Sequence, residues 1–432
     1  MKTLHYSKFA YVATVCFLLS MTMLYAQVPS ISFTTPQIYR HLLGQVKAPT
    51  NTEGAMPVLM QGVVKNLAGS TISGSTDATG TSASFFRPYD VTTDGFGNLY
   101  VADYSNNKIR KIVIATGVVT TFAGSGANGS VDNAAGTLAQ FRGPGGICYF
   151  AGNLYVSETN GSKIRKIVVS TSAVSTFAGS TMGFSDNAIG RLAKFSAPFG
   201  ITSDGSGNLY VADMSNNRIR KINISTTAVS TIAGGAGGFA DATKGTSAQF
   251  RDPWGITYDG IGNLYVADNS NNRIRKINIS TTAVTTVAGN GTTNYKSIDG
   301  NGNAASFYSP VGVTYDGAGN LYVSDYTCIR KIVVATGDVT TLTGNTYSNG
   351  SSNGDIKVAT YNRPVGLTCV GVDKIYVTEY NNHMIRFILL SGSTISPTQS
   401  VGLTLDLTTA SASAHPLVIF RKPVTAVKKL MM

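Results

Sequence analysis

The chain has 432 residues, of which 43% are hydrophobic and 13% are charged, and its formal net charge is +12. A length of this kind ordinarily indicates two or three domains, so an interpretation with a single large domain needs a specific reason. The four cysteines are scattered along the chain, which excludes a disulfide framework as the source of stability.

Residues 1–26 have the features of a secretory signal peptide. Lys2 and Lys8 flank the start of an apolar stretch from Phe9 to Tyr25, and the small residue Ala26 follows it. A basic start, a short apolar region and a small residue at its end are typical of a cleaved signal. The stretch is short for a membrane span and hydroxyl side chains interrupt it, although an uncleaved anchor is the alternative. We therefore predict a protein that is secreted to the extracellular space or the cell surface, with no membrane span after signal removal. The mature chain would keep a formal charge of +10.

Residues 27–61 show no period and are predicted to be a linker, and a repeat begins after them. The stretch from Phe250 to Gly289 is written six times, with small changes, between Phe86 and Ile388. The copies share a proline, a glycine two residues later in all but the first, the letters GNLYV or a close variant with an acid, then IRKI or a variant, and finally V-x-T in all but the sixth. The prolines recur every 54 to 57 residues: Pro88, Pro144, Pro198, Pro253, Pro310 and Pro364. A period of this size indicates a solenoid, a propeller or an array.

One repeat contains four short β-strands. The fourth copy places them at Trp254–Tyr258, Leu264–Ala267, Ile274–Ile279 and Ala283–Ala288, with turns of Asp, Gly, Asn and Ser between them. Four consecutive strands joined by tight turns form one antiparallel blade, which cannot bury both of its faces alone. The sequence therefore predicts an all-β propeller over residues 62–400.

The repeated unit P-x-G-I-T-x-D-G-x-G-N-L-Y-V-A-D-x-S-N-N-R-I-R-K-I resembles the NHL repeat, in the form common in secreted bacterial propellers. The resemblance covers residues 62–390. It implies a β-propeller fold, but it implies no single function, because NHL and related six-bladed propellers include RNA binders, receptor sensor domains, lactonases and lyases.

The two ends of the repeat region predict how the ring closes. Val63–Gly69 resembles the fourth strand of a repeat but precedes any first strand, and Pro397 weakens the expected fourth strand of the sixth copy. We therefore predict six four-stranded blades, with the N-terminal strand completing the sixth. Seven blades are the alternative, if residues 391–432 add strands. Residues 401–432 form a tail of unknown role, in which Val401 to Leu407 alternate as in a strand.

The topology places the ends of the second strands and the long loops between blades on one side, the loop face. An acid ends each second strand there: Asp103, Glu158, Asp213, Asp268, Asp325 and Glu379. We predict that each acid caps the loop that follows it or forms an exposed ion pair with the arginine of its own blade, the alternative being a metal or ligand ring. The arginines are Arg110, Arg165, Arg220, Arg275, Arg330 and Arg386. The basic third strands, such as Arg218–Lys221, also allow an anion-binding belt, for an anionic glycan or surface polymer. Nucleic acid is not expected as a partner, because a secreted protein meets little RNA.

Few residues suit catalysis. Zinc-dependent propeller lyases need several histidines at the channel, and outside the signal this chain has only His41, His383 and His415. Asp90 stands where the other copies have Gly146, Gly200, Gly255, Gly312 and Gly366. One acid at the channel mouth allows a metal contact but makes no acid/base pair. We predict no enzymatic activity and no cofactor; a metal-dependent lactonase- or lyase-like enzyme is the alternative, and a purely structural surface protein is the third reading.

Positions at which the repeats differ are the best candidates for function. The residue after each proline is Tyr89, Gly145, Phe199, Trp254, Val311 or Val365, and the residue after each acid is Tyr104, Thr159, Met214, Asn269, Tyr326 or Tyr380. Aromatic side chains on the loop face suit stacking on sugar rings or gripping a partner protein, the alternative being that they fill gaps between loops. The predicted ligand site comprises Tyr89, Asp90, Phe199, Trp254, Tyr104, Tyr326 and Tyr380. The predicted function is a monomeric, secreted binding or scaffold module for an extracellular glycan, anionic polymer or protein.

Overall fold

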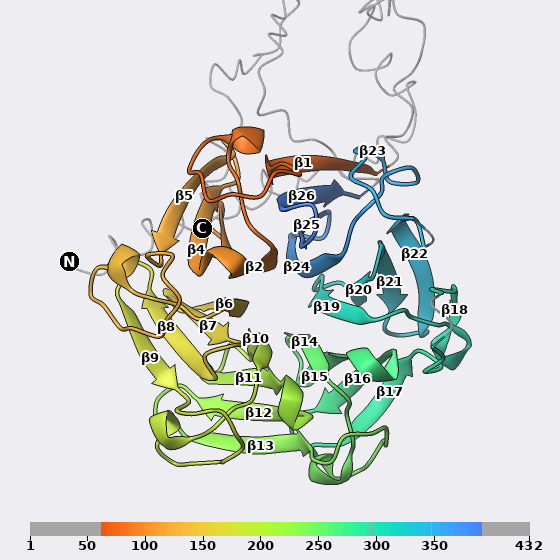
Figure 1. The fold of residues 1–432 in the computed structure, drawn as a ribbon. Helices are drawn as coiled ribbons and strands as arrows, with labels where there is room; N and C mark the ends of the chain where they lie inside the picture. Colours follow the sequence, from red (N-terminus) through yellow and green to blue (C-terminus); the bar gives the residue numbers. More distant parts are fainter. Residues whose placement is uncertain (1–61, 294–295, 347, 391–432) are drawn as a thin grey trace, which may run out of the picture. The chain divides into compact units, whose positions relative to one another are not determined.

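The computed structural model describes residues 62–293, 296–346 and 348–390, which form a ring of six antiparallel blades (Figure 1). This confirms the predicted all-β, six-bladed propeller. The described ranges contain no helix that is long and apolar enough to cross a membrane.

The first three strands of each blade follow the repeat closely. The first strands line the axis: β2 Pro88–Thr93, β6 Pro144–Phe150, β10 Pro198–Ser203, β14 Pro253–Tyr258, β19 Pro310–Tyr315 and β24 Pro364–Val370. The second strands are β3 Asn98–Asp103, β7 Asn153–Glu158, β11 Asn208–Asp213, β15 Asn263–Asp268, β20 Asn320–Asp325 and β25 Lys374–Glu379. The third strands are β4 Lys108–Val113, β8 Lys163–Val168, β12 Arg218–Asn223, β16 Arg273–Asn278, β21 Cys328–Val333 and β26 Met384–Leu389.

The outer strands and the short helical turns complete the blades. The outer strands are β5 Val118–Ala123, β9 Val174–Ala178, β13 Val229–Gly234, β17 Val284–Ala288, β22 Asp338–Gly344 and β1 Val63–Gly69, with short additions β18 Gly300–Asn301 and β23 Gly354–Asp355. Five 3₁₀ turns lie in the loops between blades: η1 Gly80–Ser82, η3 Gly136–Leu138, η4 Gly190–Leu192, η6 Gly245–Ser247 and η8 Gly302–Ala304. Three follow second strands: η2 Tyr104–Asn106, η5 Met214–Asn216 and η7 Asn269–Asn271.

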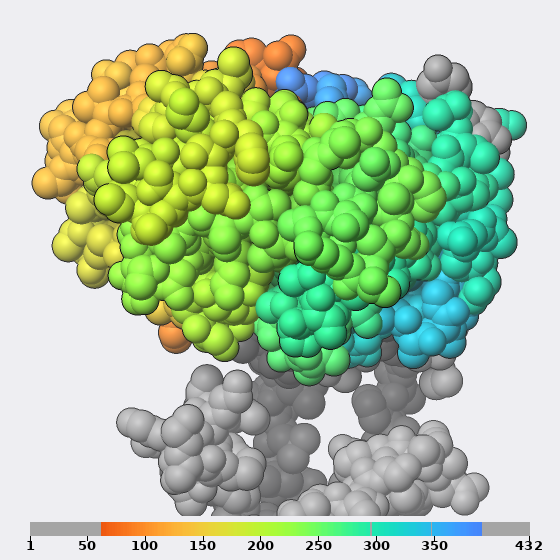
Figure 2. Space-filling model, turned by 90° about the horizontal axis from the view of Figure 1, so that it is seen from below, coloured from red at the N-terminus to blue at the C-terminus, as the bar shows by residue number. Residues whose placement is uncertain are grey.

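The core consists of six equivalent apolar clusters, each between two neighbouring blades. Between the first and second blades, for example, Tyr100 and Ile109 pack against Ile147 and Leu154. Successive side chains of a strand point to opposite faces of its sheet, so each blade supplies apolar side chains to both of its neighbours. Figure 2, seen from below relative to Figure 1, shows successive segments of the chain packed side by side, from yellow through green to cyan and blue.

The N-terminal strand closes the ring as predicted. In the sixth blade β1 pairs antiparallel with β26, with Val64 opposite Ile388, and β23 extends the same sheet beyond it. Because β1 leads directly into the first blade, hydrogen bonds join the start and the end of the repeat region. Pro397 and the expected strand near Val401 lie outside the described residues.

The acids that end the second strands pair with the arginines of their own blades, but the expectation that these pairs are exposed was wrong. All six arginines and all six acids are 0% exposed. In the third blade, Nη1 of Arg220 donates to Asp213 at 2.6 Å, and Nη2 donates to Asp186 of the preceding loop at 2.6 Å. Burial raises the pKa of Asp103 in the first blade to about 6, against the opposing effect of Arg110, so the pair is still ionised at neutral pH.

The same pairs remove the arginines from the predicted anion-binding belt. A second acid, or an asparagine in the sixth blade, reaches each of them from the loop before its blade: Asp77, Asp132, Asp186, Asp241, Asp299 and Asn353. Outside these groups, the guanidinium of Arg218 lies 3.9 Å from the centre of the Phe184 ring. The six buried arginines of the third strands are therefore part of the scaffold.

The three described cysteines are free thiols, as predicted. Cys148 and Cys328 are buried, and Cys369 is half-buried. Cys328 is the first residue of β21.

Candidate binding site at the mouth of the central channel

The residues that follow the repeat prolines gather where the six first strands converge on the axis. Tyr89, Phe199, Val311 and Val365 form one buried cluster. Tyr104, Trp254 and Tyr380 pack against it and are partly exposed. The register of the repeat brings these side chains together, because every proline starts a first strand at the loop face.

Tyr89 is the centre of this aromatic group. The centre of its ring lies 4.4 Å from that of Tyr104, 5.0 Å from Phe199 and 5.0 Å from Tyr380. Trp254 lies 4.7 Å from Phe199. These are the separations of edge-on and tilted aromatic pairs, which contribute about 0.5–1.5 kcal/mol each beyond simple burial.

The aromatic group contains both residues that fill gaps between loops and residues that are exposed enough to contact a ligand. Tyr89 and Phe199 are only 9% and 4% exposed, so they mainly fill the space between loops. Burial raises the pKa of Tyr89, so its hydroxyl stays protonated. The faces of Trp254, Tyr104 and Tyr380 that reach solvent form a rim above this buried base.

Tyr326 was wrongly grouped with these residues on the basis of the sequence. It is 41% exposed, and its ring stacks on Tyr308, 4.4 Å away. The reason is a shorter loop, since Asp325 and Arg330 are five positions apart while Asp268 and Arg275 are seven apart. Tyr326 consequently takes the left-handed backbone conformation, with a φ of 53°, just before the third strand.

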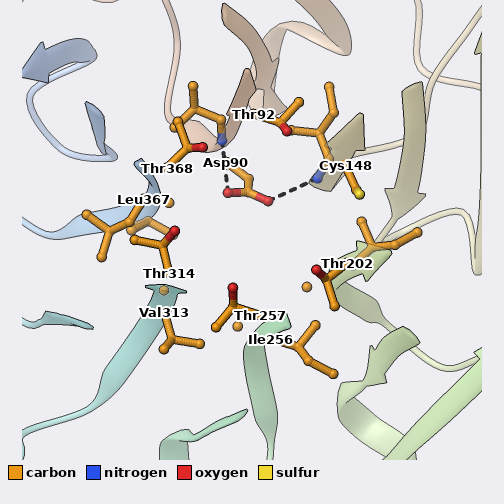
Figure 3. Close-up of a pocket in the computed structure, with 18 of the residues that line it drawn as sticks. Asp90, Thr92, Cys148, Thr202, Ile256, Thr257, Val313, Thr314, Leu367 and Thr368 are labelled. Carbon is orange, nitrogen blue, oxygen red and sulfur yellow. Dashed lines mark hydrogen bonds between the residues drawn. The ribbon is translucent and has the colours of Figure 1, made fainter. Parts of the chain in front are cut away.

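Asp90 lies in the channel, where it lines a cavity of about 120 Å³ (Figure 3). Phe199 and Val365 line both this cavity and the aromatic group. The other polar side chains of the wall come from one position of the repeat: Thr92, Cys148, Thr202, Thr257, Thr314 and Thr368. A polar cavity of this size has room for several water molecules.

The carboxylate of Asp90 joins the first two blades. Its Oδ1 accepts the N–H of Val91 at 2.9 Å, and its Oδ2 accepts the N–H of Ile147 at 3.0 Å. The other blades have glycine at the position of Asp90, because a side chain there would clash with the neighbouring blade. A Cβ on Gly366, for example, would lie 2.5 Å from the Cα of Asp90. Hydroxyls connect other blades, as Thr378 does between the N–H of Gly366 and the carbonyl of Tyr89. Asp90 therefore has a structural function in addition to being the one carboxyl group among the cavity-lining residues.

Stability should fall as the pH rises through neutrality, and Asp90→Asn should abolish part of this fall. Burial raises the pKa of Asp90 from 3.8 to about 7, so the folded protein favours the neutral carboxyl. Its contribution to stability is complete below pH 4 and is lost as the pH passes 7, with a slope of at most about 1.4 kcal/mol per pH unit. Among the cavity-lining residues the other titratable group is the Cys148 thiol, whose pKa burial raises to about 12.

Denaturant unfolding of both proteins at pH 6 and pH 8 measures this effect, since other titrating groups cancel in the difference. Equal pH dependence in the two proteins would contradict it.

No group of three or more His, Cys, Asp or Glu side chains able to hold a metal ion occurs in the described ranges. Around Asp90 the cavity wall offers threonine hydroxyls, one thiol and backbone groups.

Two residues at the rim were missed from the sequence. Arg87 and Arg363 directly precede the repeat prolines of the first and sixth blades, and their guanidinium groups lie over the Tyr380 ring. A comparison of the residue directly before each repeat proline would have found them, because the repeats differ there as well. The other blades have Gly143, Ala197, Asp252 and Ser309 at this position.

Known proteins share both the repeat and the fold. The NHL repeat profile matches residues 250–277. Human NHL repeat-containing protein 2 is 27% identical over 353 residues, which cover 72% of this chain and 47% of that protein. The protein SUPPRESSOR OF QUENCHING 1 of Arabidopsis thaliana is 28% identical over 232 residues, covering 50% of this chain and 22% of that protein. The chain thus spans about half, or less, of these curated relatives.

Solved structures agree on the fold. A structural genomics protein of unknown function from Bacteroides thetaiotaomicron superposes with a TM-score of 0.59 at 20% identity, over 76% of each chain. An auxiliary nutrient binding protein from Bacteroides ovatus gives a TM-score of 0.56 at 13% identity, also over 76% of each chain. Identities this low show the fold alone. The chain is thus a six-bladed β-propeller that carries a match to the NHL repeat and is similar in sequence to NHL repeat-containing proteins.

Proposed function

We propose that this chain is a secreted binding module that holds an extracellular glycan at the loop-face mouth of its channel. The observation that carries the proposal is the aromatic rim, in which Trp254, Tyr104 and Tyr380 present partly exposed rings above a buried base. Rigid aromatic faces stack on the apolar faces of sugar rings with little loss of conformational entropy.

The variability of the repeats supports this role. Val311 and Val365 occupy the same position as Trp254 and Phe199, so the fold does not require an aromatic residue there. Gly145 has no room for a side chain, since a Cβ there would clash with Oγ1 of Thr159 and would lie 3.3 Å from the Phe199 ring. An aromatic group assembled at positions that tolerate small residues is the pattern expected of a binding surface.

Secretion is part of the proposal and is supported by the signal-like residues 1–26. Two proteins of similar fold, from Bacteroides ovatus and Bacteroides thetaiotaomicron, are auxiliary nutrient binding proteins, which is compatible with capture of a polymer outside the cell. Binding without turnover is favoured because both oxygens of Asp90 accept backbone N–H groups, which leaves this carboxylate poorly placed to act as a base.

Replacing Trp254 by alanine should weaken glycan binding about tenfold, the effect of losing one large aromatic contact. A screen of neutral and acidic polysaccharides selects the ligand, and calorimetry then compares wild type and Trp254→Ala. Phe96→Ala is the matched control, because Phe96 is 83% exposed on a tight turn at the opposite side of the first blade. Equal affinity of Trp254→Ala and wild type, with both proteins folded, would refute the site.

A further inference from the structure

Two arginines converge on one ring of the aromatic rim. Arg87 precedes β2 in the first blade, and Arg363 precedes β24 in the neighbouring sixth blade. Their guanidinium carbons lie 5.3 Å and 4.7 Å from the centre of the Tyr380 ring. Two cationic groups thus lie beside the surface proposed to stack on a sugar.

Neither arginine has an acidic partner. In the described part of the chain, the six third-strand arginines pair with acids, whereas no ion pair forms at Arg87 or Arg363. The Arg87 side chain is exposed and that of Arg363 is half-buried. Their positive charges are consequently available to a ligand.

The scaffold does not require arginine at this position. The other blades have Gly143, Ala197, Asp252 and Ser309 there. All six residues adopt a positive φ, which is 55° at Arg87 and 57° at Arg363, so this backbone conformation belongs to the fold. The conformation disfavours residues with a side chain by about 1 kcal/mol or more, yet two adjacent blades carry long cationic ones.

The backbone positions of both arginines are fixed by hydrogen bonds. The N–H of Arg87 donates to Nδ1 of His383 at 3.2 Å, and the carbonyl of Arg363 accepts the N–H of Tyr380 at 3.0 Å. Burial, followed by the neighbouring Arg87, lowers the pKa of His383, which keeps this ring neutral and able to accept. These bonds fix the backbone of both residues beside Tyr380, and both guanidinium groups lie over that ring before any ligand binds.

We propose that Arg87 and Arg363 bind the carboxylate of a uronic acid residue whose sugar ring lies on the aromatic rim. A guanidinium group is planar and matches the two oxygens of a carboxylate with paired N–H donors. The ligand class is thus a polyuronate, an acidic polysaccharide with one carboxylate on each sugar ring. This inference rests on the proposed function and specifies its substrate.

The test compares hexagalacturonate with its fully methyl-esterified form, which keeps the sugar rings and removes the charge. Calorimetry measures both ligands with the wild-type protein and with Arg87→Gln/Arg363→Gln. Arg142→Gln/Arg251→Gln is the matched control, because it removes two exposed arginines that lie one residue earlier in the second and fourth blades. Glutamine leaves the backbone conformation of either pair unchanged.

The wild type should bind the acid about tenfold more tightly than the ester, and added salt should reduce this difference. The first double variant should bind both ligands alike, while the control keeps the preference of the wild type. Equal binding of acid and ester by the wild type would overturn the carboxylate assignment and leave the proposed glycan function standing. Binding of neither ligand would overturn the polyuronate assignment, while the proposed glycan function would still be decided by the Trp254→Ala comparison. A preference lost equally in the control would reassign it to net charge.

Discussion

Removing residues 63–69 should leave a chain that no longer folds into a stable, soluble propeller. These residues form β1, which supplies the fourth strand of the sixth blade and pairs with β26 over its whole length. Without β1 the edge of β26 is unpaired, and exposed edges of this kind promote aggregation. The apolar cluster of the sixth blade also loses Val64, which is 0% exposed.

Two single substitutions separate this effect from a simple loss of chain length. Val64→Asp places a charge on the buried face of β1. It should lower the free energy of unfolding by several kcal/mol, because the buried carboxylate has no partner. Lys65→Asp, one residue later on the exposed side, should change stability by less than about 0.5 kcal/mol. Thermal unfolding of both variants measures the difference, and a Val64→Asp protein as stable as Lys65→Asp would show that β1 is not required for closure.

Replacing Arg220 by methionine should destabilise the protein by about 3–5 kcal/mol. The Arg220 side chain donates to Asp213, to Asp186 and to the carbonyls of Lys194 and Ser185. Methionine fills a similar volume but leaves the buried Asp213 carboxylate without a cationic partner, with only Asn216 and the N–H of Ser196 still donating to it. Removal of one partner of a buried ion pair is costly for this reason, whatever the net contribution of the intact pair.

Arg218→Met is the control for this substitution. Arg218 lies two residues earlier on the same strand, is only half-buried, and stacks on Phe184. Its loss should cost about 1 kcal/mol, as expected of a partly exposed cation–π contact. Equal melting temperatures for Arg220→Met and the wild type would show that the buried charge groups do not hold the blades in shape.

The fold could be predicted from the sequence because six copies of one repeat each predict the same strands and turns. The strand bounds differ from the expected ones by about one residue; β14, for example, starts at Pro253 rather than Trp254. The closure by β1 was also accessible, since Val63–Gly69 has the pattern of a fourth strand without the other three before it.

The environment of the charges was harder to predict. Asp186 and Arg220 are 34 positions apart, and only the path of the folded loop brings the acid against the blade. An acid at a strand end therefore looked exposed, although the loop covers it. The candidate site followed from the register except for Tyr326, where the loop of the fifth blade is two residues shorter than in the fourth. Arg87 and Arg363 were missed because only the residues after the prolines and after the acids were compared between repeats.

The most direct test of the binding account uses the intrinsic fluorescence of Trp254, the only tryptophan in the chain. Titration of hexagalacturonate into the wild-type protein should give a saturable change in the emission, because the sugar covers a partly exposed indole that lies 4.7 Å from Phe199. The same titration of Arg87→Gln/Arg363→Gln should reach saturation only at about tenfold higher concentration. Saturable binding detected by calorimetry with no change in the Trp254 emission would place the ligand elsewhere and contradict the account.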